Sequence, residues 1–390
     1  MLTNIISAQG ARLPRVLAVT RTGWHRTPEG ESLYVYPDGR TWPAEARAHL
    51  ISPPERLAMA AAPVDPVPVD VARAALVEIA SHGGWAPLVA LGAGARSLGQ
   101  SIRPVTASLV IWGDPNTGKT SAAAAGRMLL LSAGWPPVVT ARFSDTAPDM
   151  EANVDFEGDM PTLLDDLALT ADASQAEQRE ARLMMERVLR PAGNAEAIRG
   201  RRRKDMTPQD KRYVRSIPVV TAQQLPRGMQ ASLYRRAVVL RLRAGDSRHK
   251  WWTPEDKGGQ GGAQRCGPAL RTIADAIIAR LGTDPDPAGI LGNAEKTALG
   301  ALGPVVDRVS PGWVDHDGGL SGVVMAGAGM LSGLILLADA VGLDADWLLR
   351  IVVEPLARAI AEQSDTMEDR RQASDDLGAA VGDVIRRALM

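Results

Sequence analysis

Eight consecutive residues have the spacing G-x-x-x-x-G-K-[ST], which is typical of loops that hold nucleotide phosphates. Two glycines let such a loop curve so that its backbone N–H groups point inward at an anion. The lysine ammonium can neutralise the β- and γ-phosphates, and the hydroxyl that follows can bind Mg²⁺. In a chain of this composition, chance would produce roughly 0.006 such matches. The residues predicted to bind ATP are Gly113, Asp114, Pro115, Asn116, Thr117, Gly118, Lys119, Thr120 and Ser121.

Two adjacent carboxylates, Asp165 and Asp166, follow the apolar residues 161–164. With Thr120, Asp165 is expected to hold Mg²⁺, directly or through water, while Asp166 acts as the general base for the attacking water. An aspartate in the second position reaches one methylene less far than a glutamate, which allows for slow hydrolysis. Paired carboxylates also occur in ordinary loops, and that alternative stays open.

Further polar residues adjoin two later strand candidates. Thr221 and Gln223 could sense the γ-phosphate or orient the lytic water, although a simple polar turn fits them nearly as well. Arg235 and Arg236 come just before an apolar run, and either fits an arginine finger that completes a neighbouring subunit's site. A solvated surface arginine is an equally good interpretation.

Short apolar runs separated by helical patterns predict a parallel α/β core around these residues. The expected strands are 108–112, 137–141, 160–164, 217–221 and 237–242. The alternation in residues 15–42 predicts a small β element, and the pattern from 263 onward is helical. The expected division is an N-terminal β-containing region at 1–59, a Pro-rich linker at 60–69, an ATPase core with its preceding helices at 70–246, and a helical C-terminal domain at 263–390.

The composition is that of a soluble globular protein, with 45% apolar and 23% charged residues and a net charge of −1. The single cysteine, Cys266, excludes an internal disulfide and a Cys-rich zinc site. The uncharged, glycine-rich stretch 318–338 favours a buried helix over a membrane span. The first residues lack the apolar core of a secretory signal, so a cytoplasmic location and no membrane partner are expected.

Positive charge is concentrated in residues 187–215, which contain ten basic and three acidic residues and therefore carry a net charge of +7. A basic loop inside an ATPase core can follow the phosphates of a nucleic-acid strand without reading its bases. A solvated loop, or one paired with the acidic residues 144–186, is the alternative. The residues predicted to contact nucleic acid are Arg199, Arg201, Arg202, Arg203 and Lys204.

Taken in chain order, these features resemble one family. They are Thr22–His25, Tyr34–Gly39, the 113–120 loop, Leu164–Asp166, Gly193-Asn194, Arg199–Arg202, Thr221 and Arg235-Arg236. The family is the helicase-like NTPase domain of unknown function in phage, plasmid and integrative-element replication proteins, related to superfamily 3 and AAA+ ring ATPases. The resemblance covers roughly residues 15–245. The family usually has Asp-Glu where this chain has Asp165-Asp166, and an acidic residue where it has Gln223.

The resemblance implies an α/β P-loop NTPase core of the AAA+ and superfamily 3 type, with the small N-terminal β element and a helical C-terminal domain. It also implies ATP and Mg²⁺ as cofactors, a homo-oligomeric ring, expected to be a hexamer, and single-stranded DNA as the partner. A primase or loader would be a separate protein. The expected function is a DNA helicase or translocase in mobile-element or phage replication. The alternatives are an ATP-gated assembly or scaffold protein, as in phage defence or packaging, and a small-molecule kinase.

Overall fold

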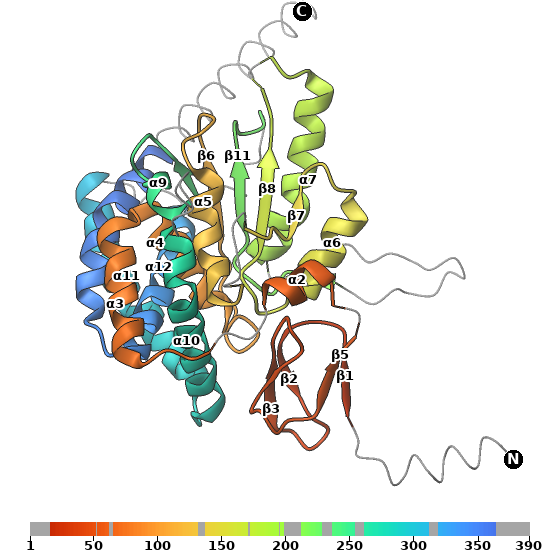
Figure 1. Cartoon of the computed structure of the whole chain (residues 1–390). Coiled ribbons are helices and arrows are strands. Elements are labelled where there is room, and N and C mark those ends of the chain that lie inside the picture. Colours follow the sequence, from red (N-terminus) through yellow and green to blue (C-terminus); the bar gives the residue numbers. More distant parts are fainter. Residues whose placement is uncertain are drawn as a thin grey trace, which may run out of the picture.

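The computed structural model describes residues 16–363, apart from 52, 62–64, 132–136, 171, 195, 199–211, 228–235, 254–260 and 312–318. Five parallel strands form its central sheet: β6 (Ser108–Trp112), β7 (Ala141–Arg142), β8 (Leu163–Leu167), β11 (Val219–Ala222) and β12 (Ala237–Arg241). Their order is β12-β6-β11-β8-β7 (Figure 1). The predicted parallel sheet is therefore present. Because the strands are parallel, their carboxyl ends share one edge, where ligands usually bind in such sheets.

Two predicted strands have different bounds in the structure. Residues 137–140 are not a strand, and β7 comprises only Ala141–Arg142. The strand expected at 160–164 is β8, which starts at Leu163 and continues through the acidic pair to Leu167. The apolar pattern was misleading in both cases, because burial on both faces makes strand and non-strand segments equally apolar.

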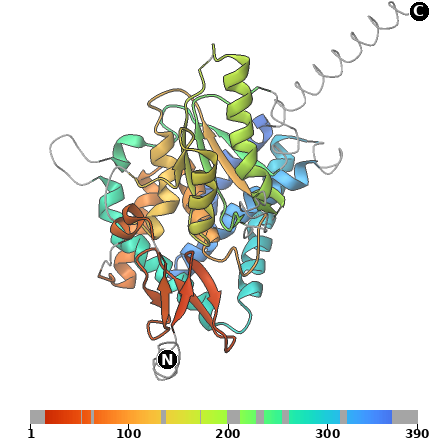
Figure 2. The ribbon, with the colours of Figure 1, turned by 90° about the vertical axis from the view of Figure 1, so that its right-hand side faces the viewer.

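Helices cover both faces of the sheet. One face carries α5 (Lys119–Ala124), its continuation η1 (Ala125–Leu129), and α4 (Trp85–Ser97) with α3 (Val69–His82) behind it. The other face carries α6 (Ala147–Phe156) and α7 (Gln175–Asn194), which turn toward the viewer in Figure 2. Along β6 the side chains alternate between two apolar clusters, with Leu109 and Ile111 in one and Val110 in the other. This alternation determines which side chains at the carboxyl edge face α5.

The predicted N-terminal β element is also present. Its strands are β1 (Leu17–Val19), β2 (Gly23–Arg26), β3 (Ser32–Val35), β4 (Thr41–Trp42) and β5 (Ala48–Leu50), followed by α2 (Glu55–Ala60). Buried Asp159, just before β8, attaches this element to the sheet. Its carboxylate accepts hydrogen bonds from Trp24 N (3.0 Å) and from Ser101 N. Gly23 has φ +92°, and any Cβ there would meet the Asp159 side chain.

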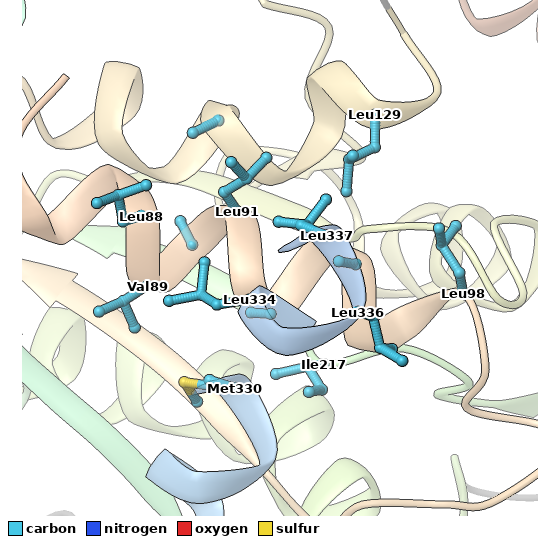
Figure 3. Packing of buried hydrophobic residues seen from close by; sticks show 14 of the residues in the cluster. Leu88, Val89, Leu91, Leu98, Leu129, Ile217, Met330, Leu334, Leu336 and Leu337 are labelled. Carbon is cyan, nitrogen blue, oxygen red and sulfur yellow. The ribbon is translucent and has the colours of Figure 1, made fainter. Parts of the chain in front are cut away.

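The C-terminal third is helical, as predicted. It contains α10 (Gly262–Thr283), α11 (Pro287–Val309), α12 (Gly319–Ala340) and a helix at 345–363. Of these helices, α12 packs on α4, and Figure 3 shows Met330, Leu334 and Leu337 of α12 beside Leu88 and Leu91 of α4. The helix α11 packs on α12, and α10 packs on α3 and η1. One apolar cluster runs through β3, α3, α4, α10 and α12. The division of the chain at 60–69 and 263 remains a sequence-based prediction.

Residues Gly322–Ala340 of α12 are long and apolar enough to cross a membrane, judged by length and composition. In the structure, 83% of the most apolar part of this segment is buried. Gly333 of α12 and Gly92 of α4 bring the two helices so close that a Cβ on Gly333 would overlap the Gly92 carbonyl oxygen. The absence of side chains at this crossing permits the contact, as the glycine content of the stretch predicted.

Gly333→Ala should therefore lower the stability of the protein by about 3 kcal/mol, because α12 must move away from α4 backbone that cannot yield. Thermal or urea unfolding would measure the change. The matched control is Gly300→Ala, on an exposed position of α11 where a Cβ would meet nothing within 4 Å. That change should stabilise the protein by about 0.5–1 kcal/mol through helix propensity. Equal effects of the two substitutions would contradict the close helix contact.

Candidate nucleotide-binding site

The 113–120 loop joins the end of β6 to the start of α5, at the carboxyl edge of the sheet. Three of its residues have positive φ: Gly113 (+148°), Asn116 (+62°) and Gly118 (+83°). A Cβ on Gly113 would lie 2.5 Å from the carbonyl oxygen of Leu242, the residue after β12. Both glycines are therefore required for the backbone conformation, and Gly113 is also required for the close approach of the neighbouring strand.

Lys119 is directed back over this loop. Its Nζ donates a hydrogen bond to the carbonyl oxygen of Asp114 at 2.7 Å, and the Thr117 hydroxyl donates to the same oxygen at 2.9 Å. Burial lowers the pKa of Lys119, while the charges of Asp114, Asp165 and Asp166 act in the opposite direction. The ammonium thus lies within electrostatic reach of both carboxylates of β8, as a site for a charged phosphate and its cation requires.

Asp165 connects three elements at this edge. Its Oδ1 accepts hydrogen bonds from the Thr120 hydroxyl of α5 (3.0 Å) and from the Thr221 hydroxyl of β11. Leu163, two residues earlier, belongs to the apolar cluster on the α5 face, so the alternation of β8 turns Asp165 to the same side. A hydroxyl and a carboxylate in contact are hard oxygen ligands of the kind that Mg²⁺ prefers.

Asp166 has an unusual backbone. Its φ is +66°, in the left-handed region, and its backbone N–H donates to the Thr221 hydroxyl at 3.1 Å. The register between β8 and β11 shifts at this point, between Val220 and Ala222. The irregularity leaves the Asp166 side chain exposed while Asp165 is partly buried. A regular strand would place these adjacent carboxylates on opposite faces, whereas a bulge of this kind changes the direction of one side chain, here that of Asp166.

Thr221 is the buried centre of this arrangement, with 2% of its surface exposed. Its hydroxyl donates to Asp165 and accepts from the backbone of Asp166, so it orients both acidic residues. Gln223 follows β11 and is partly buried, and its backbone N–H donates to the Leu167 carbonyl at 3.0 Å. The structure therefore brings the Thr221 side chain into contact with both acidic residues. Gln223 contacts Leu167, the residue that follows Asp166.

Within the described part of the chain, no group of three or more His, Cys, Asp or Glu side chains is placed to hold a metal ion. Beside nucleotides, Mg²⁺ is usually held by one or two protein oxygens together with phosphate and water oxygens. Thr120 and Asp165 would be those protein ligands. When bound, ATP would supply the phosphoanhydride bond that hydrolysis breaks.

Of the two arginines predicted to act as arginine fingers, Arg236 is described, and it lies away from the 113–120 loop. Arg236 is exposed just before β12, at the amino edge of the sheet, with its aliphatic part beside Gly193 of α7. A strand the length of β12 separates it from the 113–120 loop of its own chain, roughly 16 Å. Arg235 lies outside the described residues. So do the predicted nucleic-acid contacts, Arg199, Arg201, Arg202, Arg203 and Lys204.

The strands that flank those basic residues are described. β9 (Ala197–Ile198) and β10 (Arg212–Tyr213) pair in antiparallel fashion, with Ile198 opposite Arg212. Residues 198 and 212, at either end of the basic segment, are therefore neighbours in space.

Comparison with known proteins adds evidence on the fold. No family model and no curated protein matches this sequence. Among solved structures, a chain named "SCCmec type IV Cch - active helicase" aligns with a TM-score of 0.53 at 14% identity. The alignment covers 96% of this chain but 63% of that one, so this chain spans less than two thirds of its length. The likeness shows a shared mixed α/β fold with a parallel sheet and several helices.

Ser247 is a site residue that the sequence analysis missed. Its buried hydroxyl donates to the carbonyl oxygen of Thr117 at 2.8 Å, from a segment 130 residues later in the chain. Asp246 holds this segment in place by accepting from Trp85 Nε1 (3.2 Å) and from Arg243 N (2.8 Å). No spacing or residue type in the sequence marks Ser247, because only the position of β12 beside β6 brings it to the loop.

Ser247→Ala should weaken ATP binding about two- to tenfold, because it removes one hydrogen bond that fixes the 113–120 loop. Ser332→Ala is the matched control, since it removes a buried hydroxyl that donates to the Gly329 carbonyl at 2.6 Å on distant α12. Both variants should lose comparable stability in thermal unfolding. Isothermal titration with ATP should distinguish them, and equal ATP affinities in the two variants would show that Ser247 has no role in the site.

Proposed function

We propose that this chain is an ATP-dependent nucleic-acid motor, a DNA helicase or translocase that works as an oligomeric ring, expected to be a hexamer. The observation that carries the proposal is the convergence of the Thr120, Asp165 and Thr221 side chains at the end of the 113–120 loop. The Thr120 and Asp165 side chains are 3.0 Å apart although 45 residues separate them in sequence. A magnesium–nucleotide site needs this juxtaposition, and an incidental glycine-rich turn does not.

In this site each residue has a distinct task. The amides of the 113–120 loop and the Lys119 ammonium bind phosphate oxygens, while Thr120 and Asp165 orient Mg²⁺. Asp166, exposed beside them, accepts the proton of the attacking water. Thr221 holds the acidic residues in position, and Gln223, which follows β11, is proposed to orient that water.

The ring is supported by the position of Arg236. An arginine at the amino edge of the sheet is too far from its own 113–120 loop, but it is exposed and available to a neighbouring subunit. Arg235, its neighbour in sequence, is proposed for the same role. Supplying such an arginine in trans accelerates phosphoryl transfer and links hydrolysis to assembly.

The substrate class rests on charge and on the shared fold. The segment between β9 and β10 carries five of the basic residues in its first six positions, 199–204. A solved structure with the same fold is named as an active helicase. Single-stranded DNA is therefore the proposed partner, and replication of a phage or mobile element, with a separate primase or loader, is the proposed setting.

The test is ATP turnover of the full chain with and without a single-stranded oligonucleotide, over a range of salt concentrations. Hydrolysis should rise with the oligonucleotide, and the stimulation should fall steeply as salt increases. Substitution of Arg201, Arg202 and Arg203 by Ala should remove the stimulation and leave basal turnover intact. The matched control changes three exposed arginines of the C-terminal helices, Arg308, Arg350 and Arg358.

Particle size measured with a non-hydrolysable ATP analogue completes the test. If the protein assembles with nucleotide but DNA does not stimulate its ATP hydrolysis, the motor is contradicted and an ATP-gated scaffold is favoured. If the oligonucleotide still stimulates ATP hydrolysis in the triple variant, the basic segment does not contact the nucleic acid as proposed.

A further inference from the structure

The outer strand β7 ends next to the acidic pair, because it is the neighbour of β8 in the sheet (Figure 1). Its two residues pair with β8 in register, Ala141 opposite Leu164 and Arg142 opposite Asp165. Ala141 and Leu164 belong to the apolar cluster on the face covered by α6 and α7. Because side chains alternate along a strand, Arg142 and Asp165 both point to the other face, where α5 begins.

The backbone around Arg142 is fixed, whereas its guanidinium group has no partner. Phe143 N donates to the Asp165 carbonyl at 3.3 Å, and Asp145 N donates to the Arg142 carbonyl at 3.0 Å. The Asp145 carboxylate accepts from Arg142 N at 2.9 Å. The Arg142 side chain is exposed, and it makes no hydrogen bond, ion pair or ring contact within the part of the chain that the structure describes. The guanidinium is therefore available to a ligand bound beside Asp165.

Two of the five strands end in an arginine, Arg142 on β7 and Arg241 on β12. Leu240 belongs to the apolar cluster on the α5 face, so the alternation of β12 turns Arg241 to the opposite face. There its guanidinium lies 5.2 Å from the centroid of the Trp112 ring. Arg142 is thus the strand-end arginine that is directed to the same side of the sheet as Thr120 and Asp165.

The proposed nucleotide site has a surplus of negative charge when it is filled. Magnesium–ATP carries about two net negative charges and the two aspartates add two more, whereas Lys119 supplies one positive charge. In hydrolysis the oxygen of water bonds to the γ-phosphorus, and Asp166 takes the proton of that water. The bond to the β–γ bridging oxygen breaks, and ADP leaves with its electron pair. The negative charge that develops on these oxygens needs a further positive group beside it.

We propose that Arg142 binds the γ-phosphoryl oxygens of the nucleotide held by its own chain and stabilises the transition state of hydrolysis. This rests on the proposed function and deepens it, because it assigns a catalytic arginine that acts within one subunit, in addition to the arginine proposed to come from a neighbour. Adjacent strands are about 4.8 Å apart, so a side chain as long as arginine reaches past Asp165. A guanidinium binds phosphate oxygens with paired hydrogen bonds.

The first experiment is isothermal titration of the full chain, in the presence of Mg²⁺, with ADP and with ADP plus aluminium fluoride, which mimics the phosphoryl group in transfer. Arg142→Ala should weaken binding of the aluminium fluoride complex about 10²–10³-fold and leave the affinity for ADP within about twofold. Arg142→Lys should recover part of the loss, since it keeps the charge but not the paired hydrogen bonds. Arg26→Ala, at an exposed position that ends β2, is the matched control and should leave both affinities unchanged.

ATP turnover provides the second readout. The kcat of Arg142→Ala should fall about 10²–10³-fold with KM within about threefold, because the contact is made in the transition state. The Tm should be unchanged, since the exposed guanidinium holds no described residue in place. Mixing Lys119→Ala with Arg142→Ala chains should restore no turnover, because both groups have to come from the same subunit. A mixture of Lys119→Ala with Arg236→Ala chains should restore it, because there the arginine comes from the neighbour.

Two outcomes would overturn the proposal. If Arg142→Ala binds the aluminium fluoride complex as the wild type does, Arg142 does not touch the phosphoryl group, and slow turnover in that variant would then mean that it acts through Asp166. If the Lys119→Ala and Arg142→Ala mixture regains turnover, Arg142 serves a neighbouring subunit. A wild-type chain that binds no ATP would instead remove the proposed function itself, which the titration of the unsubstituted chain shows separately.

Discussion

Lys119→Ala should reduce ATP affinity by about 100-fold, the equivalent of roughly 3 kcal/mol, because two charge-assisted contacts to phosphate oxygens are lost together. Lys119 is suited to this role by its position rather than by its charge alone. It bends back to the Asp114 carbonyl at 2.7 Å and is close enough to Asp165 and Asp166 for their charges to affect its pKa. A phosphate group between the lysine and the acidic pair would replace the Asp114 carbonyl as its partner.

Isothermal titration with ATP and Mg²⁺ would measure this effect. Lys250→Ala is the control, because Lys250 is exposed on α9 (His249–Trp252) and the loss of one positive charge is the same. Unchanged ATP affinity in Lys119→Ala would remove the basis for the whole assignment, including the ring and the nucleic-acid path.

Asp166→Asn should slow ATP hydrolysis by about 10²–10⁴-fold while leaving ATP affinity within about twofold of the wild type. Asparagine is the informative substitution because it tolerates the left-handed conformation, so the φ of +66° and the contact with Thr221 are kept. The change therefore removes the proton acceptor and leaves the backbone as it is.

Asp165→Asn provides the contrast. Asp165 contacts Thr120 at the proposed magnesium position. This variant should therefore bind ATP more weakly in the presence of Mg²⁺ and should also hydrolyse it more slowly. Single-turnover hydrolysis with saturating ATP distinguishes the two. Wild-type turnover in Asp166→Asn would mean that another group, such as Gln223 acting through a positioned water, activates the nucleophile.

The acidic pair also bears on the rate of the proposed ATP hydrolysis. Asp166 has a shorter side chain than glutamate, and slow hydrolysis was expected on that ground. The bulge in β8 changes the direction of that side chain without lengthening it. A glutamate substituted there should raise turnover if reach limits the rate, and lower it if the bulge has already placed the aspartate correctly.

Much of the local structure could be predicted from the sequence because the relevant residues are contiguous. The 113–120 loop had to join a strand to a helix, since an apolar run of five precedes it and an alanine-rich segment follows. The helical C-terminal third and the burial of α12 followed from periodicity and from a stretch too rich in glycine for a membrane span. These features depend on neighbours along the chain, and local sequence contains that information.

The order of the strands was decided by the tertiary structure alone. Insertion of β11 between β6 and β8 places the Thr221 hydroxyl on Asp165, and nothing in residues 217–224 specifies that neighbour. Burial on both faces hid the true bounds of β7 and β8, so the acidic pair proved to lie inside a strand, at a bulge. Ser247 has no local signal, because its partner Thr117 lies 130 residues away in sequence. A motif determines what a short segment can bind, but the packing of distant segments determines which groups meet there.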